Sequence, residues 1–572
     1  MSTAEILPKD RTRVRYRALG AKELQRAREA LASEGRLDLF ATELGYETEE
    51  EAFRAVGEAL GLRFIDLSQV EVDRDLLQEF PSRVIHRHHV FPIRQERGNL
   101  VVATSNPFDL AAIDAVTAAT GRSVTPVVVM PDELDKLIKS HLGVGAETVD
   151  DLLAQSEEQS GEGVEILDEV DFDGSEDAEQ AQQASVVRLV NEILCEAIEA
   201  RASDIHLEAQ PSGMKIRYRI DGVLQKQPTP PAINRFQAAI VSRLKIMAKM
   251  NIAEKRKPQD GRIKLKVKGR EIDLRISIIP MINGEGVVMR ILDKDAMSFS
   301  LRDLGLEADY YERFRELIDR PHGIILVTGP TGSGKTTTLY SCLLEIHDEE
   351  TKIITTEDPI EYQLEGINQI QVNPKVGVTF ASSLRAILRH DPDVILVGEI
   401  RDLETAINAI QASLTGHLVF STLHTNDAAT AFIRMIDMGV EPFLVSSTVE
   451  GVMAQRLVRT LCRECRQAYM PSAEELPEDF LIDEFIASGR PLYRAAGCRH
   501  CRETGYRGRV GIFELLVPDE NIRHLASEGK SSTVIQQAAI ANGMRTLRQD
   551  GWLKVLRGQS TIEEVLRVTK AD

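Results

Sequence analysis

The sequence predicts an α/β protein built from several domains, and three observations support this fold class. The chain has 572 residues, which is too long for a single hydrophobic core. Short apolar runs alternate with amphipathic stretches, a pattern typical of strands and helices in succession. A glycine-rich turn, residues 329–336, lies between one such apolar run and a helical pattern.

Composition favours a soluble chain. The apolar fraction of 43% and the charged fraction of 28% are ordinary for globular proteins. No apolar stretch approaches the length of a membrane span, and the N-terminus has no apolar core of a secretory signal. We therefore expect a cytoplasmic location, with membrane contact only through partners. The net charge of −20 argues against binding to nucleic acid or anionic lipid.

Residues 1–145 are predicted to form a small N-terminal α/β domain with a docking or regulatory role. Thr48 precedes Glu51 by three residues, which is the spacing of a helical capping box. The helix that follows has one predicted apolar face, made of Ala52, Phe53, Val56, Ala59 and Leu60. Three apolar runs and two further helical stretches complete this region. No residue pattern in it indicates catalysis.

An acidic stretch provides the clearest domain boundary. Residues 147–179 hold 14 acidic residues and no Lys or Arg, and they include few large apolar side chains. Such a composition is typical of a flexible linker, which we place at residues 146–184. The alternative is a specific acidic docking segment.

Residues 185–300 are predicted to form a second domain, with a long amphipathic helix followed by several strands and one more helix. Four arginines lie within the strand patterns: Arg217, Arg219, Arg275 and Arg290. They are either solvent-facing residues of a sheet or a positive face presented to phosphate. The number of arginines slightly favours the second interpretation.

The turn at residues 329–336 reads G-x-x-x-x-G-K-T, the pattern of a phosphate-binding loop, in the required strand–turn–helix context. Its backbone N–H groups and the helix N-terminus can surround phosphates. Lys335 can reach the outer phosphates, and the Thr336 hydroxyl can ligate Mg²⁺. The predicted nucleotide-binding residues are Gly329, Pro330, Thr331, Gly332, Ser333, Gly334, Lys335, Thr336 and Thr337.

Acidic residues and histidines follow the next apolar runs. Glu399 ends a short apolar run 64 residues after Lys335, at the strand end where α/β proteins bind ligands. The spacing and the preceding Gly398 favour Glu399 as the residue that polarises the attacking water. An intervening strand also ends in acids, at Glu357 and Asp358. His424 follows another apolar run and is interpreted as a phosphate sensor, whereas the role of His417, before that run, is less certain.

Together these segments resemble the secretion ATPase superfamily, over roughly residues 185–572. "GPTGSGKTTTLY" looks like its Walker A motif, "TTEDPIEYQLEGINQIQVN" its Asp box, "DPDVILVGEIRD" its Walker B motif and "LTGHLVFSTLHTNDA" its His box. Further blocks, including "MGVEPFLVSSTVEGVMAQRLVRTLCRECRQAY", look more like the type II secretion branch than the pilus-assembly branch. The resemblance implies a RecA-like P-loop ATPase domain at 301–572, and a PAS-like α+β fold for the second domain.

The resemblance also implies roles and partners. Glu399 would be the catalytic glutamate, with Glu357 assisting at the Mg²⁺ and the water. Arg217, Arg219 and Arg290 would reach the nucleotide of a neighbouring subunit in a homo-hexamer. ATP hydrolysis would then drive pseudopilus assembly and protein export. The N-terminal domain would dock onto the cytoplasmic part of an inner-membrane secretion protein, and the motor would act on an inner-membrane platform protein.

Four of the six cysteines form two C-x-x-C pairs with 32 residues between them: Cys462, Cys465, Cys498 and Cys501. Four thiolates suit a closed, structural zinc site, although the gap is longer than in common zinc fingers. Many relatives carry a four-cysteine zinc subdomain here, so the resemblance implies zinc within residues 455–515. His500 is not needed as a ligand. A redox pair and unfilled thiols are the alternatives.

Three other functions remain open. A type IV pilus assembly ATPase would use the same site. A nucleic-acid translocase is disfavoured by the acidic balance and by an aromatic content of only 5%. A non-hydrolysing scaffold is disfavoured because Lys335, Thr336 and Glu399 are all present. Some relatives bind cyclic di-GMP through an R-L-G motif, but the nearest text, residues 35–51, has Asp38 in place of the glycine, so this ligand is not predicted.

Overall fold

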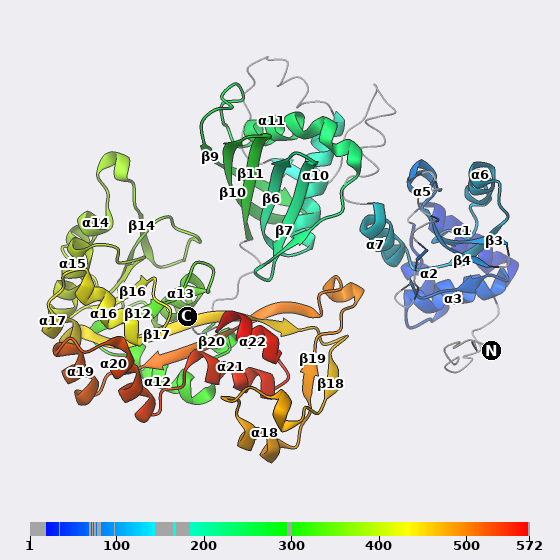
Figure 1. Cartoon of the computed structure of the whole chain (residues 1–572). Coiled ribbons are helices and arrows are strands. Elements are labelled where there is room, and N and C mark those ends of the chain that lie inside the picture. The colour runs from blue at the N-terminus through cyan, green and yellow to red at the C-terminus, as the bar shows by residue number, and fades with distance from the viewer. Residues whose placement is uncertain are drawn as a thin grey trace. The chain divides into compact units, whose positions relative to one another are not determined.

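The structure is a computed structural model. It describes residues 19–33, 35–67, 82–96, 98–142, 164–166, 184–293 and 300–569, together with residues 70, 72, 73, 76 and 80. The chain divides into two compact units, Met1–Leu292 and Asp293–Asp572, whose parts are described one by one below (Figure 1). Within the described residues, no helix combines the length and the apolar character that a membrane crossing requires.

The first part is a small α/β domain, as predicted. Its elements are α1 (Ala21–Ser33), α2 (Asp38–Leu44), α3 (Glu49–Ala59), β1 (Arg63–Phe64), α5 (Ser82–His88), β2 (Val90–Glu96), β3 (Asn99–Thr104), α6 (Leu110–Thr120), β4 (Val124–Val128) and α7 (Pro131–Leu142). The strands form one sheet in the order β1-β4-β3-β2. β2 and β3 are antiparallel, whereas β4 runs parallel to both β3 and β1.

Helix α3 starts where the capping pattern predicts. The Thr48 hydroxyl accepts a hydrogen bond from the Glu51 N–H at 3.3 Å. The Glu51 carboxylate accepts from the Glu47 N–H instead of completing the box at Thr48. Ala59, predicted on the apolar face, is exposed because the helix ends at this residue.

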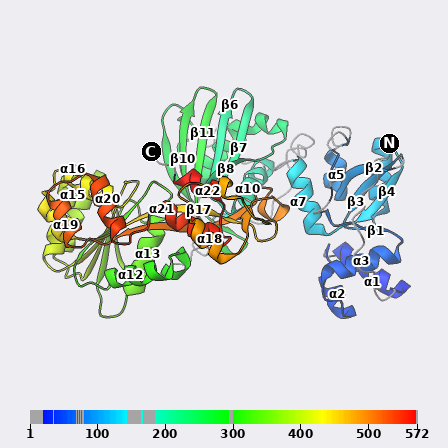
Figure 2. The same ribbon diagram turned by 60° about the horizontal axis from the view of Figure 1, so that its bottom comes forward.

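The second part is an antiparallel sheet with two helices. Its elements are β5 (Val164–Ile166), α10 (Ala184–Glu199), β6 (Ala202–Gln210), β7 (Gly213–Ile220), β8 (Val223–Lys226), α11 (Gln237–Met247), β9 (Gln259–Val267), β10 (Arg270–Met281) and β11 (Gly284–Asp293). The strand order is β5-β9-β10-β11-β6-β7-β8, and Figure 2 shows β10, β11, β6 and β7 of this sheet. One face packs on α10 and α11 in a single apolar core, which leaves the alternate, polar residues of the strands on the other face.

Strand β5 differs from the prediction, because its three residues lie inside the predicted linker, yet they pair antiparallel with β9. The remaining residues of the 146–184 segment before Ala184 lie outside the described residues.

The third part is a seven-stranded, mainly parallel sheet between two helical layers. Its helices are α12 (Ala308–Ile318), α13 (Lys335–Ile346), α14 (Phe380–Ile387), α15 (Leu403–Leu414), α16 (Ala429–Asp437), α17 (Pro442–Thr448), α18 (Ile482–Ser488), α19 (Glu520–Ser527), α20 (Ser532–Ala541), α21 (Leu547–Leu556) and α22 (Ile562–Val568). Its strands are β12 (Gly323–Thr328), β13 (Ile353–Glu357), β14 (Asn368–Gln371), β15 (Val394–Val397), β16 (Leu418–Leu423), β17 (Val449–Leu461), β18 (Gln467–Tyr469), β19 (Leu492–Arg494) and β20 (Tyr506–Leu516).

The order of this sheet is β14-β13-β15-β16-β12-β17-β20, with β20 antiparallel to β17. Alternate residues of β12 enter two different cores: Ile324 and Leu326 face one, and Ile325 and Val327 face the other. Burial on both faces explains why these strands are continuous apolar runs in the sequence. Strands β18 and β19 pair separately as a two-stranded sheet.

Candidate active site

The predicted phosphate-binding loop connects β12 to α13, both of which are present as predicted. β12 ends at Thr328, and α13 begins at Lys335 with Gly334 as its N-cap residue. The other predicted binding residues lie in this loop and the first turn of α13: Gly329, Pro330, Thr331, Gly332, Ser333, Thr336 and Thr337. The loop thus lies at the carboxyl edge of the parallel strands, with the helix N-terminus directed at it.

Lys335 is held by the loop that it belongs to. Its ammonium group donates hydrogen bonds to the carbonyls of Gly329, at 2.8 Å, and Pro330, at 3.1 Å. Burial lowers the pKa of Lys335, the Glu399 carboxylate opposes this effect, and the Arg456 guanidinium adds to it. Lys335 therefore lies within electrostatic range of both Glu399 and Arg456.

Two glycines of the loop test its packing. Gly329 has φ +147°, and a Cβ added there would lie 2.5 Å from the Ser333 hydroxyl and 2.6 Å from the Gln455 carbonyl. Gly332 has φ +79°, but an added Cβ would meet nothing within 4 Å.

We expect Gly329→Ala to weaken ATP binding at least about tenfold. The substitution adds roughly 1–2 kcal/mol of left-handed backbone strain, and the loop must also move to relieve the clash of the new Cβ with Ser333 and Gln455. Gly332→Ala adds the backbone strain without a clash, so it should weaken ATP binding less. Titration of both variants with a fluorescent ATP analogue measures the difference, and equal losses would contradict the steric explanation.

Glu399 lies just beyond the end of β15, and its side chain is only 13% exposed. Its carboxylate forms an ion pair with Arg401 and lies 3.4 Å from Nε2 of His424. His424 follows β16, the strand next to β15 in the sheet, so neighbouring strands place the two side chains together. The structure thus brings together three predicted residues: Lys335, Glu399 and His424.

His417 lies at the other end of β16. Its Nδ1 is 2.9 Å from the carbonyl of Ala412 and 3.1 Å from the Thr415 hydroxyl. These are contacts within the turn that follows α15. They place His417 at the sheet edge opposite the phosphate-binding loop.

Glu357, the predicted assisting acid, is buried at the end of β13 and already has three hydrogen-bond donors. Its carboxylate accepts from the Tyr340 hydroxyl at 2.5 Å, the Thr355 hydroxyl at 2.6 Å and the Gln369 amide at 3.0 Å. Thr355 and Gln369 donate to one carboxylate oxygen and Tyr340 to the other, which leaves one acceptor position for a water or a metal ion. Tyr340 and Gln369 lie within the Walker A and Asp box text, but the sequence did not indicate their contacts with Glu357.

The three predicted phosphate-facing arginines pair with carboxylates of their own sheet. Arg217 donates through Nε to Glu208 at 3.0 Å. Asp204 lies between the other two, 3.6 Å from Nε of Arg219 and 3.4 Å from Nε of Arg290. The register explains this pairing, because Asp204 of β6 lies opposite both arginines on the neighbouring strands. A role at phosphate stays a prediction.

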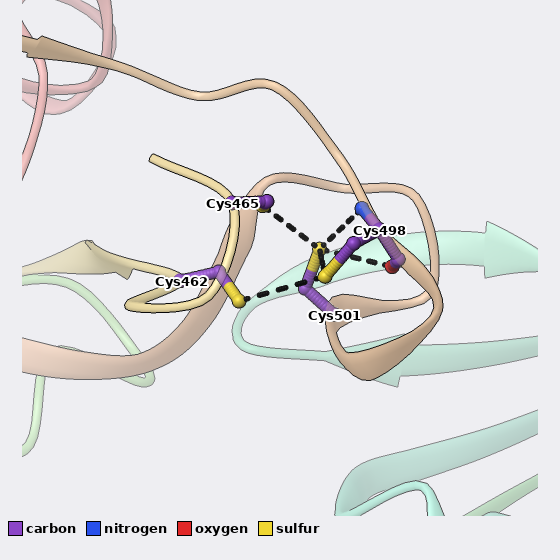
Figure 3. Close-up of side chains that lie close together, drawn as sticks. All are labelled: Cys462, Cys465, Cys498 and Cys501. Carbon is purple, nitrogen blue, oxygen red and sulfur yellow. Dashed lines mark hydrogen bonds between the residues drawn. The ribbon is translucent and has the colours of Figure 1, made fainter. Parts of the chain in front are cut away.

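The four paired cysteines converge (Figure 3). Their sulfur atoms lie within 4.8 Å of one another. Cys462–Cys498, Cys465–Cys501 and Cys498–Cys501 are separated by 3.9, 3.8 and 3.7 Å between sulfur atoms. A tetrahedral zinc ion with Zn–S bonds of about 2.3 Å requires sulfur atoms about 3.8 Å apart, so the donor set fits zinc. All four are free cysteines, and His500 contacts Arg507 instead of the cluster.

Backbone donors favour the thiolate form at one of these cysteines. Burial raises the pKa of Cys501, but the N–H groups of Cys498 and Gly505, at 3.2 and 3.1 Å from its sulfur, together with the side chains of Cys498 and Cys465, outweigh this effect and lower it. Thiolates are the form that binds metal.

Two residues beside the phosphate-binding loop were not found from the sequence. Gln455 of β17 accepts a hydrogen bond from the Thr338 hydroxyl of α13 at 2.7 Å. The next residue, Arg456, contacts the loop that follows His424. No local motif marks either residue, because only the pairing of β17 with β12 brings them to the site.

This fold and site define a P-loop nucleotidase with a parallel α/β core. Comparison with known proteins identifies the family: the family model described as "Type II/IV secretion system protein" matches residues 179–567. The chain therefore belongs to the type II/IV secretion system protein family, which confirms the resemblance predicted from the four motifs. Together with the phosphate-binding loop, this makes the chain an ATPase. A second family model, the MshEN domain, matches residues 60–148. The stretch that was compared with the R-L-G motif, residues 35–51, precedes this match.

Several curated proteins are similar over most of the chain. Type II secretion system protein E of Xanthomonas campestris is 44% identical, covering 97% of each chain. The type IV pilus assembly ATPase PilB of Myxococcus xanthus is 40% identical, covering 98% of each chain. Type II secretion system ATPase E of Vibrio cholerae is 52% identical over 68% of this chain and 77% of its own. Among solved structures, the ATPase DotB of Legionella pneumophila is similar in fold, with a TM-score of 0.50 and 23% identity, over 67% of this chain and 95% of its own.

Proposed function

We propose that this protein is a Mg²⁺-dependent ATP hydrolase that works as a homo-hexameric motor of type II secretion, on the cytoplasmic side of the inner membrane. The observation that carries the proposal is the convergence of Lys335, Glu399 and His424 at the carboxyl edge of the parallel sheet. Relatives named as type II secretion proteins support the biological assignment.

The residues of the site have distinct roles in this proposal. The loop from Gly329 to Thr337 holds the phosphates through its N–H groups, and Lys335 exchanges its present carbonyl contacts for phosphate oxygens. Glu399 orients the attacking water and takes its proton, while His424 reports on the terminal phosphate. Thr336 would hold Mg²⁺, and the bound ion would neutralise the negative charge that develops on the phosphate during hydrolysis.

The other domains complete the proposed motor. Arg217, Arg219 and Arg290 would approach the nucleotide of a neighbouring subunit, which requires their contacts with Glu208 and Asp204 to open. The N-terminal domain would dock onto the cytoplasmic part of an inner-membrane secretion protein, and the hexamer would act on the platform protein. The four cysteines would hold a structural zinc ion.

Assembly of a type IV pilus is the second candidate, favoured by the similarity to PilB over nearly the whole chain, including its N-terminal part. The two candidates share the same catalytic chemistry. They differ in the membrane partner, so complementation of a secretion mutant and of a pilus mutant with this gene would separate them.

Hydrolysis of ATP by the purified chain tests the proposal. We expect activity that disappears when Mg²⁺ is chelated and when Lys335 is changed to Ala, because the lysine charge and the metal both stabilise the phosphate. DNA should not stimulate it. Stimulation by DNA, with affinity that falls steeply as salt rises, would support a nucleic-acid translocase instead. Activity that survives Lys335→Ala would contradict the assigned site.

A further inference from the structure

Arg456 links β17 to the segment that follows β16, and these two strands lie on either side of β12, which leads into the phosphate-binding loop. β17 runs parallel to β12, with Ala454 opposite Thr328, the last residue of β12. Arg456 thus lies just beyond the point where β12 ends. Its guanidinium donates to the backbone carbonyl and to the side-chain oxygen of Asn426, both at 3.0 Å, and to the Gln455 carbonyl at 3.1 Å.

These hydrogen bonds bridge the strand that carries the phosphate-binding loop. Asn426 follows β16, and β12 lies between β16 and β17 in the sheet. The Arg456–Asn426 contact therefore spans the end of β12. The Gln455 carbonyl that accepts from Arg456 is also the atom that a Cβ on Gly329 would approach to 2.6 Å. The positive charge of Arg456 contributes to the lowered pKa of Lys335, which agrees with this placement.

The segment 424–428, which we call the His424 loop, is fixed at three points. His424 lies 3.4 Å from Glu399, Asn426 is held by Arg456, and the Ala428 N–H donates to the buried Glu514 carboxylate at 2.8 Å. Only one of these three contacts, the one at Asn426, is made by a cation, and this cation, Arg456, lies within electrostatic range of Lys335. Its acceptors at Asn426 are neutral, whereas a terminal phosphate offers charged oxygens. A phosphate adds Coulomb attraction to the hydrogen bond and can accept from two N–H groups of a guanidinium at once.

We propose that Arg456 is a positioning residue that couples the terminal phosphate of the nucleotide to the His424 loop. With ATP bound, the phosphate attracts the guanidinium and weakens its hydrogen bonds to Asn426, so the loop is released. With ADP bound, the guanidinium stays on Asn426 and the loop is fixed. This inference rests on the proposed function and deepens it, because it assigns a conformational signal to the chemistry at Glu399.

The test is hydrogen exchange of residues 424–428 in the full-length chain, with ADP and with a non-hydrolysable ATP analogue. In the wild type we expect exchange about fivefold or more faster with the analogue than with ADP, within the usual range of coupling between sites. In Arg456→Gln the difference should vanish. The same variant should lose at least about tenfold in kcat while KM changes less than about twofold, because Lys335 and the loop N–H groups still hold the phosphates in the ground state.

Two further variants separate coupling from simple stabilisation. Asn426→Ala keeps the charge beside the nucleotide and the backbone acceptor but removes the side-chain acceptor, so its His424 loop should exchange faster with ADP than the wild-type loop does. Arg315→Gln removes the ion pairs of Arg315 on α12 with Asp319 and with Glu345 near the end of α13, and it should change neither exchange nor kcat.

An Arg456→Gln chain with the wild-type difference in exchange would overturn the inference, as would an Asn426→Ala loop that exchanges like the wild type with ADP. Failure of the wild type to bind either nucleotide would overturn the proposed function instead.

Discussion

Replacement of Glu399 by glutamine is expected to slow ATP hydrolysis at least tenfold while nucleotide binding is retained. Glutamine keeps the size of the side chain but cannot take a proton from the attacking water. A tenfold loss corresponds to about 1.4 kcal/mol of transition-state stabilisation, a lower bound for a residue that orients the water. Steady-state hydrolysis and titration with a fluorescent ATP analogue, on the same preparation, measure both quantities.

The control for this prediction is Glu528→Gln. Glu528 is a partly exposed acid beside His524 and Lys530, outside the site, so its variant should hydrolyse ATP at the wild-type rate. If Glu399→Gln also matches the wild type, the assignment of the base is wrong. The role would then pass to Glu357, whose carboxylate has one acceptor position beyond its contacts with Tyr340, Thr355 and Gln369.

The core of the catalytic domain was predictable because its signals are local. β12, the phosphate-binding loop and α13 are contiguous in sequence, and the loop pattern exists only in that context. Glu399 and His424 were predictable for a related reason: each follows a short, fully buried parallel strand, and the carboxyl ends of such strands meet at one edge.

The rest depends on contacts between distant segments. Glu357 accepts hydrogen bonds from Tyr340 of α13 and Gln369 of β14, and only the fold, not the Asp box text, shows that these side chains reach it. Arg456 belongs to the site only because β17 pairs with β12 across more than 100 residues of chain. Arg217, Arg219 and Arg290 were expected to face phosphate, but sheet register gives each of these three a nearby carboxylate. Strand β5 was missed because its acidic neighbourhood dominates the local composition.

Removal of zinc is expected to have the largest effect on stability. Cys498→Ser removes one of four thiolates, and zinc-finger peptides derive about 10–16 kcal/mol of apparent folding free energy from the complete site. The loss here should be smaller, because part of this region also packs into the main core through Phe485 and Leu492. We expect metal analysis to find one zinc ion per wild-type chain and none in the variant. Hydrogen exchange should rise most in residues 462–505.

The same change should reach the nucleotide site, because β17 extends from Gln455, beside the phosphate-binding loop, to Leu461, next to Cys462, with one irregularity in its pairing with β20 between Arg459 and Leu461. Chelation of zinc in the wild type should therefore reduce hydrolysis as well as stability. Cys195→Ser is the matched control, since this half-buried cysteine lies on α10 and outside the cluster. It should keep its zinc and its activity.

A wild-type chain that contains no zinc, and whose four clustered thiols all react with a thiol reagent in the native state, would contradict the metal assignment. Loss of zinc without any change in hydrolysis would instead limit its role to the local fold and show that β17 does not transmit the disturbance.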